Sequence, residues 1–125
     1  MSAVVLDAGA FIAVENNDRL MVARLREAQR KSRPLRTSAI VVAQVWRGAR
    51  QANLARLLQS VDVLPVDELT ARAAGTLLAK TATVDPVDAA LVLVAQNDDY
   101  ILTSDPDDIS ILVTACGRRV TVVAC

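Results

Sequence analysis

The sequence predicts an α/β fold in which a parallel β-sheet carries helices on both of its faces. Segments typical of strands alternate with segments of helical periodicity along the chain. The first of them, residues 3–6, is uninterruptedly apolar, as is typical of a strand buried on both faces of a parallel sheet. Hydrophobic residues make up 53% of the sequence and aromatic residues 2%, so we expect an aliphatic core. The 125 residues predict one domain, spanning 1–125.

The first half of the chain alternates strand and helix patterns that are separated by turn-forming residues. The run 16–18 (Asn-Asn-Asp) predicts a turn, and Pro34 ends the helical pattern that follows it. Ser38 is a favourable N-cap for the next helix, which is apolar on nearly all sides and is therefore expected to be buried. The predicted elements are a strand at 3–6, a helix that begins at 11–14, a helix at 19–31, a strand at 35–37, and helices at 39–46 and 54–58.

The second half of the chain continues the same alternation. Its first strand contains Pro65, which favours the edge of a sheet. Asp85 and Asp105 each precede a proline and are followed by an acid three residues later, a pattern typical of a helix N-terminus. Gly117 predicts the end of the last helix. The predicted elements are a strand at 61–66, a helix at 69–79, a helix at 89–95, a strand at 100–103, a helix from about 107 to 116, and a strand at 120–124.

Composition excludes several classes of function. The sequence contains no histidine, so acid–base and metal chemistry must come from carboxylates. Its two cysteines, Cys116 and Cys125, form no disulfide framework, which favours a reducing, cytoplasmic compartment. The first residues do not resemble a signal peptide, and the longest apolar run, 89–95, is far shorter than the ~20 residues of a transmembrane helix. We therefore expect a soluble protein with no membrane partner.

The net charge of zero conceals an uneven distribution of charge. Residues 1–56 carry ten Lys and Arg against four Asp and Glu, whereas residues 57–125 carry four against ten. Such a separation indicates a polyanionic partner for the basic half. Alternatively, Arg24, Arg26 and Arg30 are simply the solvated face of an amphipathic helix.

Four acids stand where an α/β sheet places its ligands. Asp7 and Asp105 each follow a predicted strand, so both belong at the carboxyl edge of the sheet. Asp88 begins an apolar helix, and Asp108 lies in the first turn of the next one. The alternative for these residues is helix capping, which is sufficient to explain Asp85.

Carboxylates gathered at one edge would repel one another, and their pKa values would rise. A hard divalent cation relieves that repulsion, and Mg²⁺ or Mn²⁺ prefers oxygen ligands. The chemistry that this arrangement suggests is metal-assisted attack of water on a phosphodiester. Thr103 and Ser104 would add hydroxyl groups to the site, unless they serve only in hydrogen bonds at the end of the strand.

Four segments of this chain resemble the PIN domain family, in particular the VapC-type toxin ribonucleases of bacterial toxin–antitoxin pairs. No segment is diagnostic alone, but the four occur in the expected order and spacing over nearly the whole chain. They are Val5-Leu6-Asp7-Ala8-Gly9-Ala10, Ala43-Gln44-Val45-Trp46-Arg47-Gly48, Val87-Asp88-Ala89-Ala90-Leu91 and Leu102-Thr103-Ser104-Asp105-Pro106-Asp107-Asp108.

The resemblance implies a five-stranded parallel sheet of order 3-2-1-4-5 and a Mg²⁺-dependent endoribonuclease. It also implies a homodimer and a small VapB-like antitoxin that blocks the site. Asp7 and Asp88 would be the principal metal ligands and catalytic residues. Asp105 would complete the cluster, and Asp108 would be more peripheral.

One position departs from the family pattern, because Gln44 stands where the family usually has Glu. The change removes one negative charge and would weaken a second metal more than a first. Gln44 either points into the acidic crevice, where it orients a water molecule, or reaches a neighbouring backbone carbonyl. The favoured function is an active ribonuclease; the alternatives are a module that binds RNA or an antitoxin without cutting, and a DNA nuclease.

Three arginines are candidates for contacts with RNA phosphates or with an acid of the antitoxin. They are Arg47, Arg50 and Arg56. Arg47 lies about one helical turn beyond Gln44, so we expect it to face the same cleft.

Overall fold

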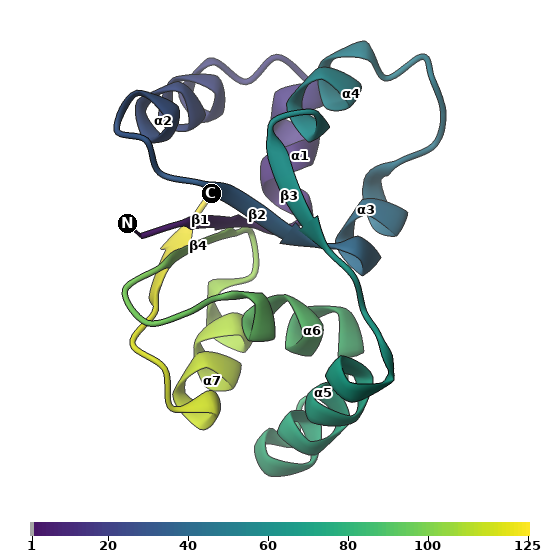
Figure 1. The fold of residues 1–125 in the computed structure, drawn as a ribbon, viewed down its shortest axis with the longest axis vertical. Helices are drawn as coiled ribbons and strands as arrows, with labels where there is room; N and C mark the ends of the chain where they lie inside the picture. Colours follow the sequence, from purple (N-terminus) through teal and green to yellow (C-terminus); the bar gives the residue numbers. More distant parts are fainter. Residues whose placement is uncertain (1) are drawn as a thin grey trace.

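The computed structural model describes residues 2–125 and contains one parallel sheet of five strands in the order β3-β2-β1-β4-β5 (Figure 1). The α/β fold and the predicted strand order are therefore confirmed. Neighbouring strands pair in register, with Val5 opposite Arg36 on one side and opposite Ile101 on the other. The strands are β1 (Val4–Leu6), β2 (Leu35–Ser38), β3 (Val61–Leu64), β4 (Tyr100–Thr103) and β5 (Thr121–Ala124).

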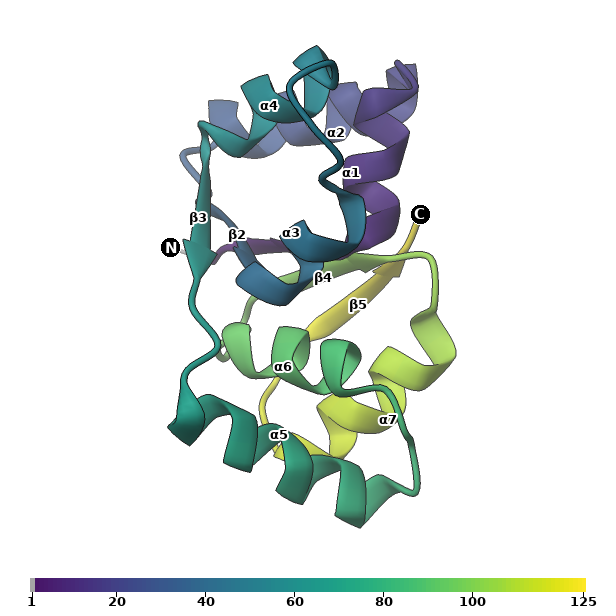
Figure 2. The same ribbon diagram turned by 90° about the vertical axis from the view of Figure 1, so that its right-hand side faces the viewer.

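Helices cover both faces of this sheet (Figures 1 and 2). Helices α1, α2 and α4 lie on one side, and α5, α6 and α7 lie on the other, while α3 contacts both α1 and α6. The described residues include no helix long and apolar enough to cross a membrane. The helices are α1 (Ala8–Glu15), α2 (Arg19–Arg30), α3 (Ala39–Val45), α4 (Ala52–Leu58), α5 (Glu68–Thr81), α6 (Pro86–Val94) and α7 (Pro106–Cys116).

The central strand β1 is apolar because it has no exposed face. All three of its residues are buried, since β2 and β4 flank it and helices pack above and below. Phe11 of α1 and Leu91 of α6 are fully buried on opposite sides of the sheet. Each such side chain contributes roughly 2 kcal/mol by leaving water. The core is otherwise made of Ala, Val, Leu and Ile, in agreement with the aliphatic composition.

Side-chain caps fix the beginnings of most helices. The side chains of Asp18, Ser38, Asp67 and Asp85 each accept a backbone N–H of the helix that follows, an interaction worth about 1 kcal/mol. The predicted caps at Ser38 and Asp85 are thus confirmed. Pro86 occupies the first helical position after the Asp85 cap, as the sequence pattern predicts, so α6 begins before the apolar run at 89–95.

Helix α3 differs from its prediction in length and in burial. It ends at Val45, and only Val41 and Val45 are buried. Ile40, Ala43 and Gln44 are exposed, because α3 packs against its neighbours with a single face and the other face meets solvent. The expectation of a helix buried on nearly all sides was wrong. An apolar composition is compatible with burial of a helix, but the number of elements that pack against the helix determines how many of its residues are buried.

Both ends of the sheet are open edges. Strand β3 pairs only with β2 among the described strands, so the expectation of an edge strand near Pro65 is confirmed. The strand stops at Leu64, directly before the proline, whose nitrogen has no hydrogen to donate to a neighbouring strand.

Candidate metal centre

The carboxyl ends of β1 and β4 lie side by side and define the candidate site. The backbone N–H of Asp7, directly after β1, donates to the carbonyl of Leu102 in β4 at 3.0 Å. The loop after β4 leads through Asp105 into α7. Because both strands are parallel neighbours, the residues that follow them emerge at the same edge.

Three of the four predicted acids gather at this edge. Carboxylate oxygens of Asp88, Asp105 and Asp108 all lie within 4.8 Å of one another. Asp88 comes from the first turn of α6, whereas the other two come from the start of α7. Within residues 2–125, no hydrogen bond to the side chain of Asp88 occurs, although that residue is only 8% exposed. No buried side-chain oxygen of the described residues lacks a hydrogen-bond partner, so the carboxylate oxygens of Asp88 reach the surface and are accessible to a ligand.

The electrostatics of the cluster follow from this crowding. Burial, together with smaller contributions from repulsion by Asp85, Asp7, Asp105 and Asp108, raises the pKa of Asp88 from 3.8 to about 7. Repulsion from Asp105 likewise raises the pKa of Asp108 above its usual value. The prediction that gathered carboxylates would titrate at higher pH is confirmed for these two residues.

Asp7 borders the cluster but is not one of the three gathered carboxylates. It is 6% exposed, and both of its oxygens are occupied: Oδ1 accepts the backbone N–H of Ala8, and Oδ2 accepts the hydroxyl of Thr103, each at 2.7 Å. Its negative charge contributes to the raised pKa of Asp88. The role of Asp7 as a metal ligand stays a prediction, and its hydrogen bond to Ala8 shows that it also caps α1.

Thr103 links the acids that flank it. Its buried hydroxyl donates to Asp7 and accepts the backbone N–H of Asp105 at 3.0 Å. Asp105 itself occupies the N-cap position of α7 without a side-chain cap bond, so capping does not explain its carboxylate. Ser104 is exposed and lies so close to Gly9 that a Cβ there would sit 2.8 Å from its Oγ. Glycine at position 9 therefore lets α1 approach the site.

Gln44 is exposed and forms no side-chain hydrogen bond with any described residue. The predicted bond to a neighbouring backbone carbonyl is therefore not observed, and the role of Gln44 in orienting a water molecule at the acidic crevice stays a prediction. Arg47 lies beyond the end of α3, so the expectation that it continues the helical face of Gln44 was wrong. Its guanidinium instead donates to the carbonyls of Ala43 and Trp46, at 3.1 and 2.8 Å.

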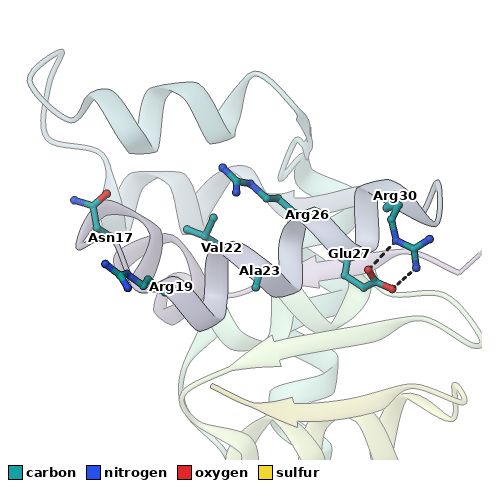
Figure 3. A pocket seen from close by; sticks show the side chains of 7 residues that line it. All are labelled: Asn17, Arg19, Val22, Ala23, Arg26, Glu27 and Arg30. Carbon is teal, nitrogen blue, oxygen red and sulfur yellow. Dashed lines mark hydrogen bonds and ion pairs between the residues drawn. The ribbon is translucent and has the colours of Figure 1, made fainter.

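Four of the ten basic residues of the first half lie on α2. The side of this helix that faces the sheet is apolar, and its outer face has a hollow of about 680 Å³, which is lined by Asn17, Arg19, Val22, Ala23, Arg26, Glu27 and Arg30 (Figure 3). Arg30 is paired with Glu27 at 2.6 Å. An amphipathic helix with a solvated basic face, one of the two predicted alternatives, is confirmed for α2.

The residues of the cluster fit a hard divalent cation. Every donor in it is a carboxylate oxygen, and no Lys or Arg of the described chain forms an ion pair with Asp88, Asp105 or Asp108. Mg²⁺ and Mn²⁺ take oxygen ligands of this kind and keep several waters. Such an ion would offset the mutual repulsion of the three carboxylates.

One buried acid escaped the sequence analysis. Asp99, which the sequence places in a turn, is 3% exposed and accepts the backbone N–H groups of Ala3 and Gln96, both at 2.8 Å. These bonds tie the start of β1 to the turn before β4, at the opposite end of the strands from the cluster. The position of Asp99 directly before an apolar strand was the feature of the sequence that could have indicated its burial.

Comparison with solved structures shows that this fold is shared with chains of three known complexes. A chain of the VapBC2 complex from Rickettsia felis bound to a promoter DNA fragment superposes with a TM-score of 0.68 at 11% identity, covering 98% of each chain. A chain of DNA-bound VapBC from Salmonella typhimurium gives 0.66 at 20% identity, covering 98% of each. A chain of FitAB bound to the IR36 DNA fragment gives 0.62 at 19%, covering 97% of this chain and 94% of that one. No match was found among curated proteins.

The sequence itself assigns the family. The family model described as PIN domain matches residues 4–112, which include all four predicted acids. PIN domains are generally nucleases. Since the match spans most of the chain, this protein belongs to the PIN domain family.

Proposed function

We propose that this protein is a divalent-metal-dependent endoribonuclease that acts as the toxin of a toxin–antitoxin pair. The observation that carries the proposal is the group of Asp88, Asp105 and Asp108, whose oxygens converge at the carboxyl edge of the sheet. Family membership supports nuclease chemistry. The shared fold with chains of VapBC and FitAB complexes supports a VapB-like antitoxin as partner.

In this proposal, Asp88, Asp105 and Asp108 hold Mg²⁺ or Mn²⁺, and Asp7 borders the ion and acts with Asp88 and Asp105 in catalysis. A divalent cation held there supplies positive charge against the phosphodiester and acidifies the attacking water. The choice of RNA rather than DNA as substrate follows from the resemblance to VapC-type toxins.

The chain positions these acids before any ion arrives. Helices α1, α6 and α7 all begin at the site, so the positive ends of three helix dipoles offset part of the carboxylate repulsion. Thr103 fixes the orientation of Asp7 through one hydrogen bond and holds the backbone of Asp105 through another. The acids are thus presented by rigid elements rather than by mobile loops.

The remaining roles are assigned by exposure and charge. Arg50 and Arg56 are exposed and form no ion pair with any described residue, which leaves them free for phosphates or for an antitoxin acid. Arg47 is exposed too, although two carbonyls occupy its guanidinium. We further propose a cytoplasmic homodimer, as the resemblance implies.

The direct test is cleavage of single-stranded RNA by the purified protein with Mg²⁺, with Mn²⁺ and with EDTA. We expect cleavage with either metal and none with EDTA, and we expect Asp88→Asn to abolish it. Asp107→Asn is the matched control, because Asp107 is an exposed acid in the same first turn of α7 but lies outside the cluster. Equal cleavage by the wild-type protein and Asp88→Asn would overturn the catalytic assignment.

A second experiment tests the biological role. Expression of the chain alone should arrest growth, and co-expression of the small neighbouring gene should relieve the arrest. Mapping of the RNA ends produced during the arrest identifies the target. If the chain binds RNA without cutting it, the alternative of a non-catalytic binding module is favoured.

A further inference from the structure

A cavity of about 340 Å³ opens directly beside the acidic cluster. Asp88 and Asp108 form one of its sides, so the cavity and the cluster share two residues. Its other sides come from the connection between α5 and α6, which passes alongside α7 (Figure 2), and from α7 itself. A group bound in this cavity would therefore lie next to a cation held by the carboxylates.

The cavity displays apolar side chains that the fold does not need. Val84 is 88% exposed and Ile111 is 47% exposed, and both line the cavity. Exposed apolar side chains at a concave surface are typical of ligand contacts rather than of packing. Val84 and Ile111 provide an uncharged surface next to the carboxylates of Asp88 and Asp108.

The polar side chains of the cavity have free hydrogen-bond acceptors but no free donor. The hydroxyl of Thr81 donates to the carbonyl of Leu77, at 3.1 Å. Thr83 must then donate to Thr81, at 2.7 Å, which leaves only lone pairs on the Thr83 oxygen. Asp85 uses Oδ1 to cap α6 and keeps Oδ2 free as an acceptor. No Lys or Arg lines the cavity as the structure describes it.

We propose that this cavity binds the nucleobase next to the scissile phosphodiester, and that it prefers guanine to uracil. The proposal rests on the proposed nuclease function, because a cation held by the carboxylates would bind the phosphate while the cavity receives the adjoining nucleoside. Single-stranded RNA is commonly read through bases that are splayed out, packed on side chains and bonded along their edges. Guanine presents two adjacent N–H donor groups to these acceptor side chains, whereas uracil presents a single N–H between two carbonyls that the side chains cannot pair.

The test uses short single-stranded RNAs in which one nucleotide next to the mapped cleavage point is varied. The nucleotide before the cleavage point and the nucleotide after it are varied in separate sets of RNAs. In each set, the varied nucleotide is guanosine, uridine or an abasic residue. We expect the guanosine RNA to be cut about tenfold more efficiently than the other two, mainly through a lower KM. Equal cleavage of all three would overturn the base site while leaving the nuclease function intact.

Variants locate the effect in the cavity. Val84→Ser and Thr83→Val should each lose most of the preference for guanosine and leave cleavage of the abasic RNA unchanged. Leu69→Ser is the matched control, because Leu69 is 79% exposed and lies at the other end of α5. A preference that survives in both cavity variants would place base recognition elsewhere and overturn the proposal.

A binding measurement separates the two proposals. With Mn²⁺ present, we expect the wild-type protein to bind GMP about tenfold more tightly than ribose 5-phosphate, and Val84→Ser to lose that difference. If this holds but no RNA is cut, the nuclease function fails and the base site stands. If GMP and ribose 5-phosphate bind equally while Val84→Ser weakens only antitoxin binding, the cavity belongs to the partner protein and the base site is overturned.

Discussion

The hydroxyl group of Thr103 donates a 2.7 Å hydrogen bond to Oδ2 of Asp7 across the junction of two neighbouring strands. The hydroxyl oxygen of Thr103 also accepts the backbone N–H of Asp105. One buried threonine thus ties together two acids that lie almost a hundred residues apart in the sequence. Parallel pairing brings the carboxyl ends of β1 and β4 to one edge of the sheet, and this bridge links the two acids that follow them.

Replacement of Thr103 by valine removes this bridge while it preserves the shape of the side chain. Because Asp7 then loses a buried donor, we expect the free energy of unfolding to fall by about 1–3 kcal/mol and kcat to fall about tenfold or more. Thr103→Ser should restore most of the kcat, since it keeps the hydroxyl. Denaturant melts and single-turnover cleavage measure the two effects, with Thr114→Val, on the exposed face of α7, as the control. An unchanged kcat in Thr103→Val would show that the bridge is dispensable.

Binding of a divalent ion should be visible without any substrate. A ligand that binds only the folded state raises stability, so we expect Mg²⁺ or Mn²⁺ to raise the Tm of the wild-type protein. Asp88→Asn should lose most of this increase, whereas Asp107→Asn should keep it. Thermal melts with a series of metal concentrations provide the measurement. If both variants respond to metal like the wild type, the ion does not bind at the cluster.

The raised pKa of Asp88 predicts how the stability of the metal-free protein depends on pH. Folding raises this pKa from 3.8 to about 7, so the folded state binds a proton more tightly than the unfolded state does. Stability from this residue is therefore complete below the unfolded pKa and is lost as the pH rises from about 4 through 7. Asp88→Asn should flatten that part of the profile and stabilise the protein at pH 8 in EDTA. A wild-type stability that rises between pH 5 and 8 in EDTA, with no difference in the variant, would contradict this assignment.

Gln44 allows a test of the non-catalytic alternative. Since it is exposed and has no hydrogen-bond partner in the described chain, we expect Gln44→Glu to change the free energy of unfolding by less than about 0.5 kcal/mol. We expect the wild-type protein to cut RNA and the variant to cut it at a similar or higher rate with Mg²⁺. If the wild type is inert and Gln44→Glu gains cleavage, the natural protein is a binding module whose site the glutamine has disabled. Gln29→Glu, an exposed position on α2, controls for the added charge.

The unpaired arginines predict a salt-dependent contribution to RNA binding. Arg50→Ala and Arg56→Ala should each weaken RNA binding for all sequences alike and reduce the slope of log K against log salt by about 1. Arg72→Ala is the control, because Arg72 is paired with Glu68 at 2.7 Å on α5. Filter binding at several salt concentrations, with Asp88→Asn as background to prevent cleavage, gives the slopes. Identical slopes for all three variants would remove the two arginines from the RNA interface.

The sequence alone predicts most of the fold. Apolar runs such as 3–6 and 100–103 mark buried strands, and residues such as Ser38 and Asp85 mark helix starts, because these signals depend on local backbone chemistry. The acids of the site also stand out in sequence, since each follows a strand or begins a helix. Strand order required the resemblance to a family, because pairing between distant segments leaves no local trace.

Only the tertiary structure decides which acids meet. Asp88, Asp105 and Asp108 share one space, Asp7 borders it with both oxygens already engaged, and Asp99 serves the backbone at the other end of the strands. Likewise, the apolar residues around Gln44 indicate burial, but a helix of 7 residues with one packed face leaves that side chain in solvent. Local chemistry fixes what each segment forms, whereas hydrogen bonds and packing between distant segments fix which side chains become neighbours.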